Sequence, residues 1–207
     1  RAGVAVPRTV MLPQKDYIPA IDKRRSLRNL EFPLGWEAIV EYVGFPAILK
    51  PADGGGWRDV TVVKSPAELL RAYDASTTNV MTLQEFIEFD EYVRCICIGK
   101  DRVLPIQYSP SRRCYIHNEK NDWVSREMWD RVIQDSVKVN TLLGYDMNSV
   151  EFAIKDGVAY AIDFTNPAPD MEYWSITDLY FDRVVDAMVR LAVRLADAGR
   201  NRPAEMT

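Results

Sequence analysis

Residues 47–63 read AILKPADGGGWRDVTVV, in which two apolar, β-branched runs enclose a lysine, a proline, three consecutive glycines and an arginine. The runs predict two short strands, and the glycines predict the loop between them. Consecutive glycines cost backbone entropy, so they persist where the chain adopts positive φ or must approach another group closely. Phosphate meets that need, because amides without side chains can all point at one anion. The stretch therefore predicts a hairpin that closes over phosphate, with a plain mobile turn as the alternative.

Lys50 ends the first of these strands, directly before the glycines. An ammonium has little reason to follow an apolar strand unless it meets an anion. Lys50 and the glycines Gly54, Gly55 and Gly56 are therefore candidate phosphate-binding residues. The pattern differs from G-x-x-x-x-G-K-[ST] and G-x-G-x-x-G, because a strand and not a helix follows the loop.

The composition limits the classes of protein that this chain can be. With 207 residues, of which 47% are hydrophobic and 11% aromatic, the chain can bury a core of one or two domains. A net charge of −4 argues against a broad basic face, so no nucleic-acid partner is expected. No apolar run suits a membrane span and no signal peptide is recognisable, so a cytoplasmic protein without a membrane partner is expected. Because the chain opens at RAGVAVPRTV, with an apolar run already under way and no initiator methionine, we expect a fragment.

Three cysteines and the single histidine form a C-x-C…C-x-x-H set of Cys95, Cys97, Cys114 and His117. Such a set can hold zinc. The alternation of YVRCICI instead points Cys95 and Cys97 into a core, and this interpretation is favoured. One histidine excludes histidine-based triads and multi-histidine metal sites.

The hydrophobic spacing predicts an α+β protein built around antiparallel sheets. Helices are predicted at 35–44, 65–74 and 125–143, and in a terminal stretch that contains Phe181, Val184, Val185, Met188, Ala192 and Leu195 and ends near Gly199. Strands are predicted at 5–12, 47–50, 60–63, 79–87, 91–99, 102–108, 148–154 and 158–164. Ser65, Pro66 and Glu68 form a capping box for the second helix. The charged residues 22–25 are predicted as a loop or short helix.

The stretch NSVEFAIKDGVAYAIDFTNP predicts a hairpin whose two strands face one core. Its large apolar residues all lie at even-numbered positions and so share one parity: Val150, Phe152, Ile154, Val158, Tyr160, Ile162 and Phe164. Both strands can face one core if the connection has three residues, Lys155–Gly157, with Gly157 in the left-handed region. The opposite face then carries Glu151, Ala153, Ala159, Ala161 and Asp163, two carboxylates among methyl groups that leave room for a ligand.

Asn166 lies just beyond the second strand of this hairpin. Carboxylate and amide oxygens are hard donors that suit a Mg²⁺ ion also bound to phosphate oxygens. Glu151, Asp163 and Asn166 are therefore candidate magnesium ligands. The alternative is a solvated sheet face with ordinary acidic residues.

In the order and spacing of its motifs the chain resembles the ATP-grasp proteins, over nearly its whole length. The motifs are Gly3–Thr9, Lys50-Pro51 with the glycines, Leu83–Ile87 followed by Glu91, and Glu151…Asp163…Asn166-Pro167. The resemblance implies two α/β subdomains with antiparallel sheets that grip the nucleotide between them. Residues 1–88 would form the small subdomain with the glycine flap, and residues 89–207 the C-terminal subdomain with the metal site. It also implies an N-terminal substrate domain that is missing upstream.

The resemblance assigns the nucleotide-binding residues. Lys50 would bind the α and β phosphates of ATP, and the loop Gly54–Gly56 would close over them. The adenine slot would be lined by Gln84, Glu85, Phe86 and Ile87. Glu91 would hold the ribose hydroxyls.

The resemblance also assigns magnesium to Glu151, Asp163 and Asn166. The family usually has acid-x-Asn at the end of the second metal strand, whereas Asp163 and Asn166 are three residues apart. Thr165 therefore competes with Asn166 for the third position. Arg94 resembles the arginine that follows the hinge strand in the carboxylate-amine ligase branch.

The resemblance implies an ATP-dependent ligase that joins a carboxylate to an amine through an acyl phosphate. Its partners would be small-molecule or peptide carboxylates and amines, with a homo-oligomer left open. Arg94, Arg112 and Arg113 are the candidate catalytic residues. Arg112 and Arg113, with Lys120, would meet an acidic substrate or the γ-phosphate, or else are solvated loop charges. The alternatives are a catalytically idle nucleotide-binding or regulatory module and a zinc-stabilised interaction domain.

Overall fold

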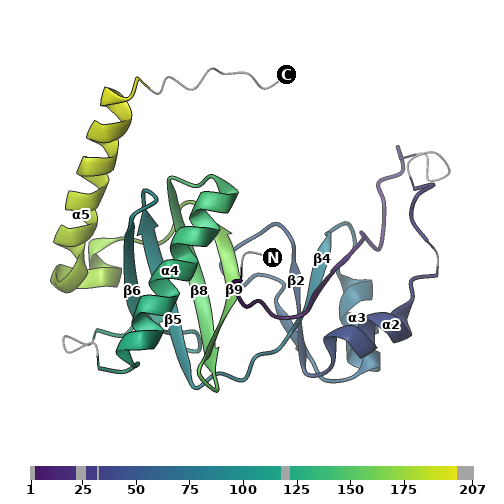
Figure 1. The fold of residues 1–207 in the computed structure, drawn as a ribbon. Coiled ribbons are helices and arrows are strands. Elements are labelled where there is room, and N and C mark those ends of the chain that lie inside the picture. The colour runs from purple at the N-terminus through teal and green to yellow at the C-terminus, as the bar shows by residue number, and fades with distance from the viewer. Residues whose placement is uncertain (1–2, 22–26, 32, 118–121, 200–207) are drawn as a thin grey trace. The chain divides into compact units, whose positions relative to one another are not determined.

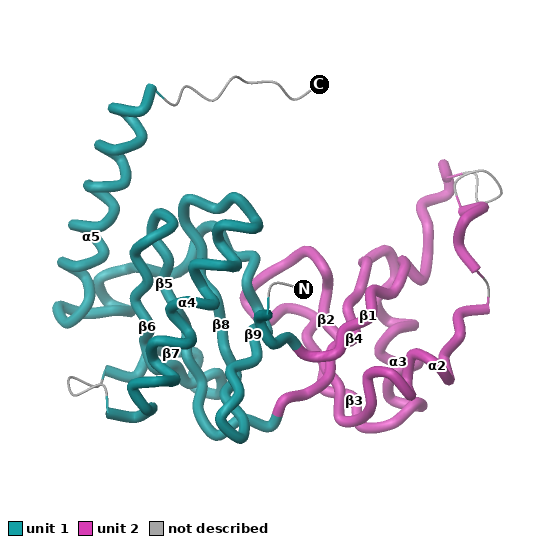
Figure 2. The backbone as a smooth tube through the Cα atoms, viewed as in Figure 1, with its two compact units in different colours: residues 1–6, 88–207 teal, residues 7–87 magenta. Residues whose placement is uncertain are grey.

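The computed structural model describes residues 3–21, 27–31, 33–117 and 122–199, which fold into two compact units. Unit 2 comprises residues 7–87, and unit 1 comprises residues 1–6 and 88–207 (Figure 2). The charged stretch 22–25 and Lys120 lie outside the described residues.

Unit 2 contains a four-stranded antiparallel sheet in the order β1-β4-β2-β3. Its strands are β1 (Thr9–Leu12), β2 (Ala47–Pro51), β3 (Thr61–Val63) and β4 (Met81–Glu85), and its helices are α2 (Trp36–Val43) and α3 (Pro66–Ala75). The core is made of alternate strand residues and the inner helix faces, and includes Leu12, Val43, Ala47, Leu49, Val63, Leu69, Tyr73, Met81 and Leu83.

The helix ends of unit 2 follow the predicted signals. Ser65 caps α3, because its hydroxyl accepts a hydrogen bond from the Glu68 amide at 3.3 Å. The Glu68 carboxylate accepts from the amide of Lys64 at 2.8 Å, one residue before the partner that a capping box requires. Gly44, with φ of 80°, ends α2 as predicted.

Unit 1 contains a five-stranded antiparallel sheet in the order β7-β6-β5-β8-β9. Its strands are β5 (Glu91–Ile98), β6 (Arg102–Ser109), β7 (Cys114–Tyr115), β8 (Met147–Lys155) and β9 (Val158–Asn166), and its helices are α4 (Arg126–Leu143) and α5 (Tyr173–Asp197). The short strand β7 was not predicted, and α5 begins eight residues before the stretch expected from its apolar stripe. The predicted α+β class is confirmed. Among the described residues, no helix has the length and apolarity that a membrane span needs.

Helix α4 covers one face of this sheet and packs against β5, β6, β8 and β9 (Figure 1). The core between them contains Val93, Cys95, Cys97, Val132, Val139, Val150, Phe152, Ile154, Ala159 and Ala161. Because side chains alternate along a strand, the residues between these positions point to the other face. That other face carries the predicted metal ligands.

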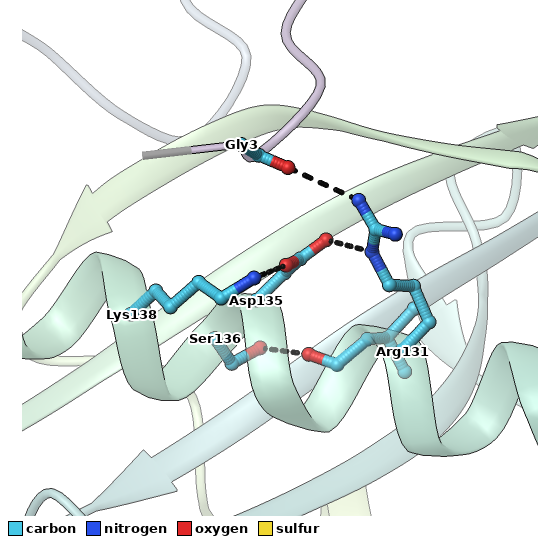
Figure 3. A network of polar contacts seen from close by, with 6 residues as sticks. Gly3, Arg131, Asp135, Ser136 and Lys138 are labelled. Atoms are coloured by element: carbon cyan, nitrogen blue, oxygen red, sulfur yellow. Dashed lines mark hydrogen bonds and ion pairs between the residues drawn. The ribbon is translucent and has the colours of Figure 1, made fainter. Parts of the chain in front are cut away.

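The N-terminal segment is held against α4 and β9 of unit 1. Ala5 forms a parallel bridge with Tyr160, so the predicted strand 5–12 is divided between the two units. Arg131 donates to the carbonyl of Gly3 at 3.0 Å and also pairs with the fully buried Asp135 at 2.6 Å (Figure 3). Lys138 approaches the second oxygen of the same carboxylate at 2.9 Å (Figure 3). The buried charge is thereby balanced, and the segment is fixed beside β9.

Candidate functional site

The hairpin β8–β9 carries the candidate metal ligands, and its turn differs from the prediction. Lys155 and Val158 are paired, so the connection is the two-residue turn Asp156-Gly157 and not a three-residue loop. Both turn residues have positive φ, 48° and 75°, as in the tight turns whose twist matches that of the strands. The expected three-residue connection is therefore wrong.

The tighter turn changes which side chains of β9 face the helix. Ala161 lies opposite Phe152 and Ala159 lies opposite Ile154, so both alanines are in the core beneath α4. Tyr160 lies opposite Ala153 on the other face, although the parity of the sequence placed it in the core. The predicted alanine-lined ligand face is thus wrong for Ala159 and Ala161, because a turn shorter by one residue inverts the parity of the strand that follows.

Two register shifts beyond Ala161 change the facing of β9 again, because each adds one residue to that strand. The first shift lies between the pairs Phe152–Ala161 and Glu151–Asp163. The second lies between the pairs Glu151–Asp163 and Ser149–Asn166. Asp163 becomes the direct partner of Glu151, and Asn166 becomes the partner of Ser149. Directly opposite residues share a face, so the structure brings the two carboxylates together. It also places Asn166 on their face, three residues from Asp163.

Glu151 is held by two side chains from the neighbouring strand β5. Arg94, which is paired with Glu151 in the sheet, donates from Nη2 to Oε1 at 2.6 Å. The hydroxyl of Tyr92 donates to Oε2. The side chains of Arg94 and Glu151 are only 13% and 11% exposed, so this ion pair is largely shielded from water.

The guanidinium of Arg94 also lies 3.9 Å from the ring centre of Tyr108 and 5.6 Å from that of Tyr115. Burial is the largest single influence on the pKa of Arg94 and lowers it, but the attraction of the Glu151 carboxylate together with the contributions of Tyr115 and Tyr108 outweighs burial, so the pKa is raised. Burial and then the charge of Glu151 raise the pKa of Tyr92 well above its ordinary value. Tyr92 therefore stays protonated and remains a donor to Glu151.

The remaining polar groups differ in their position and in how they are held. Glu91 is paired in the sheet with the core residue Ile154, so it does not share the face of Glu151, and it accepts a hydrogen bond from Gln107 at 3.1 Å. Asp163, opposite Glu151, is exposed. The hydroxyl of Ser149, the cross-strand partner of Asn166, is buried and has no hydrogen-bond partner among the described residues. A buried hydroxyl of this kind calls for a water or ion as its partner.

In unit 2, Lys50 and the glycine loop have the local geometry that the sequence predicts. β2 and β3 pair as an antiparallel hairpin, and Lys50 lies at the loop end of β2. Gly54, Gly55 and Gly56 are exposed, with φ of 157° at Gly54 and 67° at Gly56. An added Cβ at Gly55 or Gly56 would meet nothing within 4 Å, so the fold itself leaves these positions open.

The predicted adenine-binding strand is fixed by its neighbours. The carboxylate of Glu85 pairs with Arg8, whose Nη2 lies 2.8 Å from Oε1 and whose Nε lies 3.0 Å from Oε2. The hydrogen bonds from Arg8, more than its charge, lower the pKa of Glu85. Gln84 is buried and its amide donates to Thr9 at 3.4 Å.

Phe86 and Ile87 follow β4 and are half-buried. The amide of Phe86 donates to the carbonyl of Pro46 at 3.2 Å, and that of Glu85 donates to Arg8 at 2.8 Å. The backbone of this strand is therefore ordered at the predicted hinge.

Arg112 and Arg113 are exposed residues of the turn between β6 and β7. Neither side chain forms a hydrogen bond or ion pair with the described part of the chain. Arg113 has φ of 55°, and the amide of Arg112 donates to the Ser109 hydroxyl at 3.4 Å. Their proposed contact with substrate stays a prediction.

The zinc alternative is not supported. Within the described residues, no three His, Cys, Asp or Glu side chains form a group that could hold a metal ion. Cys95 and Cys97 are fully buried in the core beneath α4, as their alternation predicted. Burial raises the pKa of Cys97 to about 11, so it remains a thiol and not a metal-binding thiolate.

Sequence reasoning missed the roles of Arg8, Tyr92 and Asn148, among others. Arg8 and Tyr92 bind predicted site carboxylates from distant strands, and no local pattern announces such a pairing. The sequence places Asn148 in a strand but gives it no role. An amide side chain within an apolar strand was the available signal, because a buried amide needs hydrogen-bond partners, and Asn148 is fully buried.

No protein-family model matches the chain. Among curated proteins, the D-alanine–D-alanine ligase of Halothermothrix orenii is 24% identical over 178 residues, which cover 75% of this chain and 52% of the ligase. The chain thus spans about half the length of that curated relative.

Solved structures match over most of the chain. The D-alanine–D-alanine ligase from Bacillus anthracis complexed with ATP has a TM-score of 0.64 and 18% identity, and the match covers 95% of this chain and 62% of the ligase. The ATP-grasp ligase PsnB, complexed with minimal precursor, Mg and ADP, has a TM-score of 0.58 and 17% identity, with 93% and 55% covered. The fold predicted from the sequence is confirmed.

Proposed function

We propose that this chain, which has the ATP-grasp fold, is the ATP-binding part of a ligase that joins a carboxylate to an amine. The observation that carries the proposal is the pairing of Glu151 with Asp163 on adjacent strands, beside Arg94. Two carboxylates and a guanidinium on one sheet face suit a magnesium ion together with the phosphates of a nucleotide. Relatives of this fold include ligases solved with ATP and with Mg and ADP.

The residues on this face fit magnesium as their donor chemistry predicts. Glu151, Asp163 and Asn166 would hold the ion through oxygen atoms, and the unpartnered hydroxyl of Ser149 would bind one of its waters. Bound magnesium would neutralise phosphate charge and orient the γ-phosphate for transfer. Because these three side chains cannot complete the near-octahedral shell of magnesium, the chain would bind the ion firmly only together with the phosphates of ATP.

The remaining positions have roles that follow from their charge. Lys50 and the amides of Gly54–Gly56 would bind phosphate oxygens, since the open positions of the loop allow close approach. Arg94 keeps Glu151 oriented and adds positive charge beside it. Glu91, held by Gln107, would accept hydrogen bonds from the ribose hydroxyls. The strand Gln84–Ile87 would line the adenine.

The reaction proceeds in two transfers. An oxygen of the substrate carboxylate attacks the γ-phosphorus, a new P–O bond forms, and the bond to the β-phosphate oxygen breaks so that ADP leaves. The amine nitrogen then attacks the acyl carbon, the bond to phosphate breaks, and the nitrogen gives up a proton. Both transfers need positioning and charge neutralisation more than a protein nucleophile, which suits a chain with one histidine.

The irregular spacing of Asp163 and Asn166 was the sequence feature that favoured a catalytically idle module. The register shifts in β9 place both residues on the face of Glu151 despite that spacing. The spacing by itself therefore does not favour the idle module.

ADP release in the presence of magnesium and paired carboxylate and amine substrates tests the proposal. Amino acids and short peptides are the first panel, because both functional groups occur in them. Release that needs both substrates and is lost in Asp163→Asn supports a ligase. If the protein binds ATP but no substrate pair in the panel causes ADP release, the idle module is favoured.

A further inference from the structure

The proposed metal face, which is the sheet face that carries Glu151, Asp163 and Asn166, depends on an irregularity in β9 that must be held in place. In a regular strand, residues three apart point to opposite faces, so Asn166 would point away from Asp163. The second register shift, between the partners of Glu151 and Ser149, removes this conflict by adding one residue to β9. Such a bulge disrupts the ladder and leaves backbone groups without their usual partners.

The side chain of Asn148 supplies the missing partners. Asn148 lies on β8 and is fully buried. Its Oδ1 accepts from the backbone amide of Asn166 at 2.9 Å, and its Nδ2 donates to the carbonyl of Phe164 at 2.9 Å. One amide group thus binds the backbone on both sides of Thr165, the residue between them.

A second buried amide fixes the orientation of the first. Asn140 on α4 accepts from Asn148 Nδ2 at 2.9 Å, and its side chain is also buried. Because Nδ2 meets two oxygens, the amide of Asn148 has only one orientation that satisfies all three hydrogen bonds. The helix that covers the core thereby fixes the strand that carries Asp163 and Asn166.

We infer that Asn148, oriented by Asn140, is a positioning residue that holds the β9 bulge and so turns Asn166 onto the metal face with Asp163. Its side chain points to the α4 side of the sheet, so it acts through the backbone and touches neither metal nor nucleotide. The inference rests on the proposed function only where it links this geometry to metal binding. The role of Asn148 in the bulge is testable without any ligand.

The ligand-free test is hydrogen exchange of backbone amides in Asn148→Ala. Exchange at Asn166 is expected to accelerate at least about tenfold more than at the β5–β8 ladder, because the amide loses its acceptor. The matched control is Ser136→Ala, which removes another buried hydrogen bond, from the hydroxyl to the carbonyl of Val132 at 2.7 Å. That control should leave the relative exchange of Asn166 unchanged. Unchanged exchange at Asn166 in Asn148→Ala would overturn the inference.

The ligand-bound test is the affinity for Mn²⁺, used as a paramagnetic probe for magnesium, in the presence of a non-hydrolysable ATP analogue. Loss of a group that orients a ligand weakens metal binding about 10- to 100-fold, and this is expected for Asn148→Ala but not for Ser136→Ala. If Asn148→Ala does not fold, Asn140→Ala tests the same hydrogen bonds from the helix, with a smaller effect of the same sign. Equal weakening in the Asn148 and Ser136 variants would reduce Asn148 to a general contributor to stability. Absence of Mn²⁺ binding in the unmodified protein would contradict the proposed metal site, while the exchange result would still decide the role of Asn148.

Discussion

The two regions assigned to phosphate and metal are built in opposite ways. On the β8–β9 hairpin, Glu151 is largely buried and held by an arginine and a tyrosine, and the bulge beside it is held by Asn148. On the β2–β3 hairpin, the glycines are exposed, and added side chains at Gly55 and Gly56 would meet open space. The proposed metal face is therefore organised by contacts within unit 1, whereas the exposed glycine loop is expected to become ordered when an anion binds.

This contrast predicts where substitutions act. Changes at the buried pair Arg94–Glu151 should cost stability as well as ligand binding, because these groups bind each other inside the protein. The exposed Asp163 on the same face should affect ligand binding alone. Changes in the glycine loop should cost ligand binding and leave the ligand-free fold nearly unaffected.

Arg94→Met should give the largest effect. Removing the arginine leaves the carboxylate of Glu151 buried without its cation, which costs about 3–5 kcal/mol of unfolding free energy. Urea unfolding followed by tryptophan fluorescence measures the loss. The double variant Arg94→Met/Glu151→Gln should recover most of it, because no unpaired charge remains. A single variant as stable as the unmodified protein would show that the metal face is not held by this pair.

Substitutions of two neighbouring glycines should separate conformation from ligand binding. Gly56 has φ of 67°, so Gly56→Val should cost about 1–2 kcal/mol of stability. Gly55 does not adopt a left-handed conformation and its Cβ would have open space, so Gly55→Val should change stability by less than about 0.5 kcal/mol. Both variants should bind ATP more weakly in calorimetric titration, because a β-branched side chain blocks close approach to the amides. A large loss of stability in Gly55→Val would mean that the loop serves the fold.

The smallest effect is expected at the exposed pair Arg8–Glu85 in unit 2. The pKa of Glu85 is lower in the folded protein than in the unfolded chain. The ionised Glu85 carboxylate therefore contributes fully to stability above the unfolded pKa of about 4.3. This contribution is lost as the pH falls through the lower pKa of the folded protein. Arg8→Gln should flatten the acid side of the stability profile. Unfolding in urea at a series of pH values from about 5 to 3 measures the slope. An identical slope in both proteins would exclude this pair as the source.

Much of the fold was predictable because it depends on local signals. Gly44 and Ser65 end and begin helices as the capping rules require, and the alternation of Cys95 and Cys97 placed both in a core. The fold class then followed from the order of these elements and from the resemblance of the motifs.

The candidate site was less predictable because its geometry depends on compensating irregularities. The two-residue turn Asp156-Gly157 inverts the parity of β9, and the first bulge inverts it again before Asp163. The expectation that Glu151 and Asp163 share a face thus agrees with the structure, although the turn assumed for it was wrong. The contacts of Arg8, Tyr92 and Asn148 join residues that are distant in sequence or that lie in bulged backbone, and neither feature has a periodic signal.

The most direct test of the central claim is the thermal stability of the protein with ATP, measured with magnesium and with EDTA. A metal face on β8–β9 predicts that magnesium and ATP together raise the melting temperature well beyond ATP alone, because a ligand that binds only the folded state stabilises it. Asp163→Asn should abolish the magnesium-dependent part of this shift. Because Asp163 is exposed, the ligand-free melting temperature of that variant should hardly change. A full magnesium-dependent shift in Asp163→Asn would contradict the account.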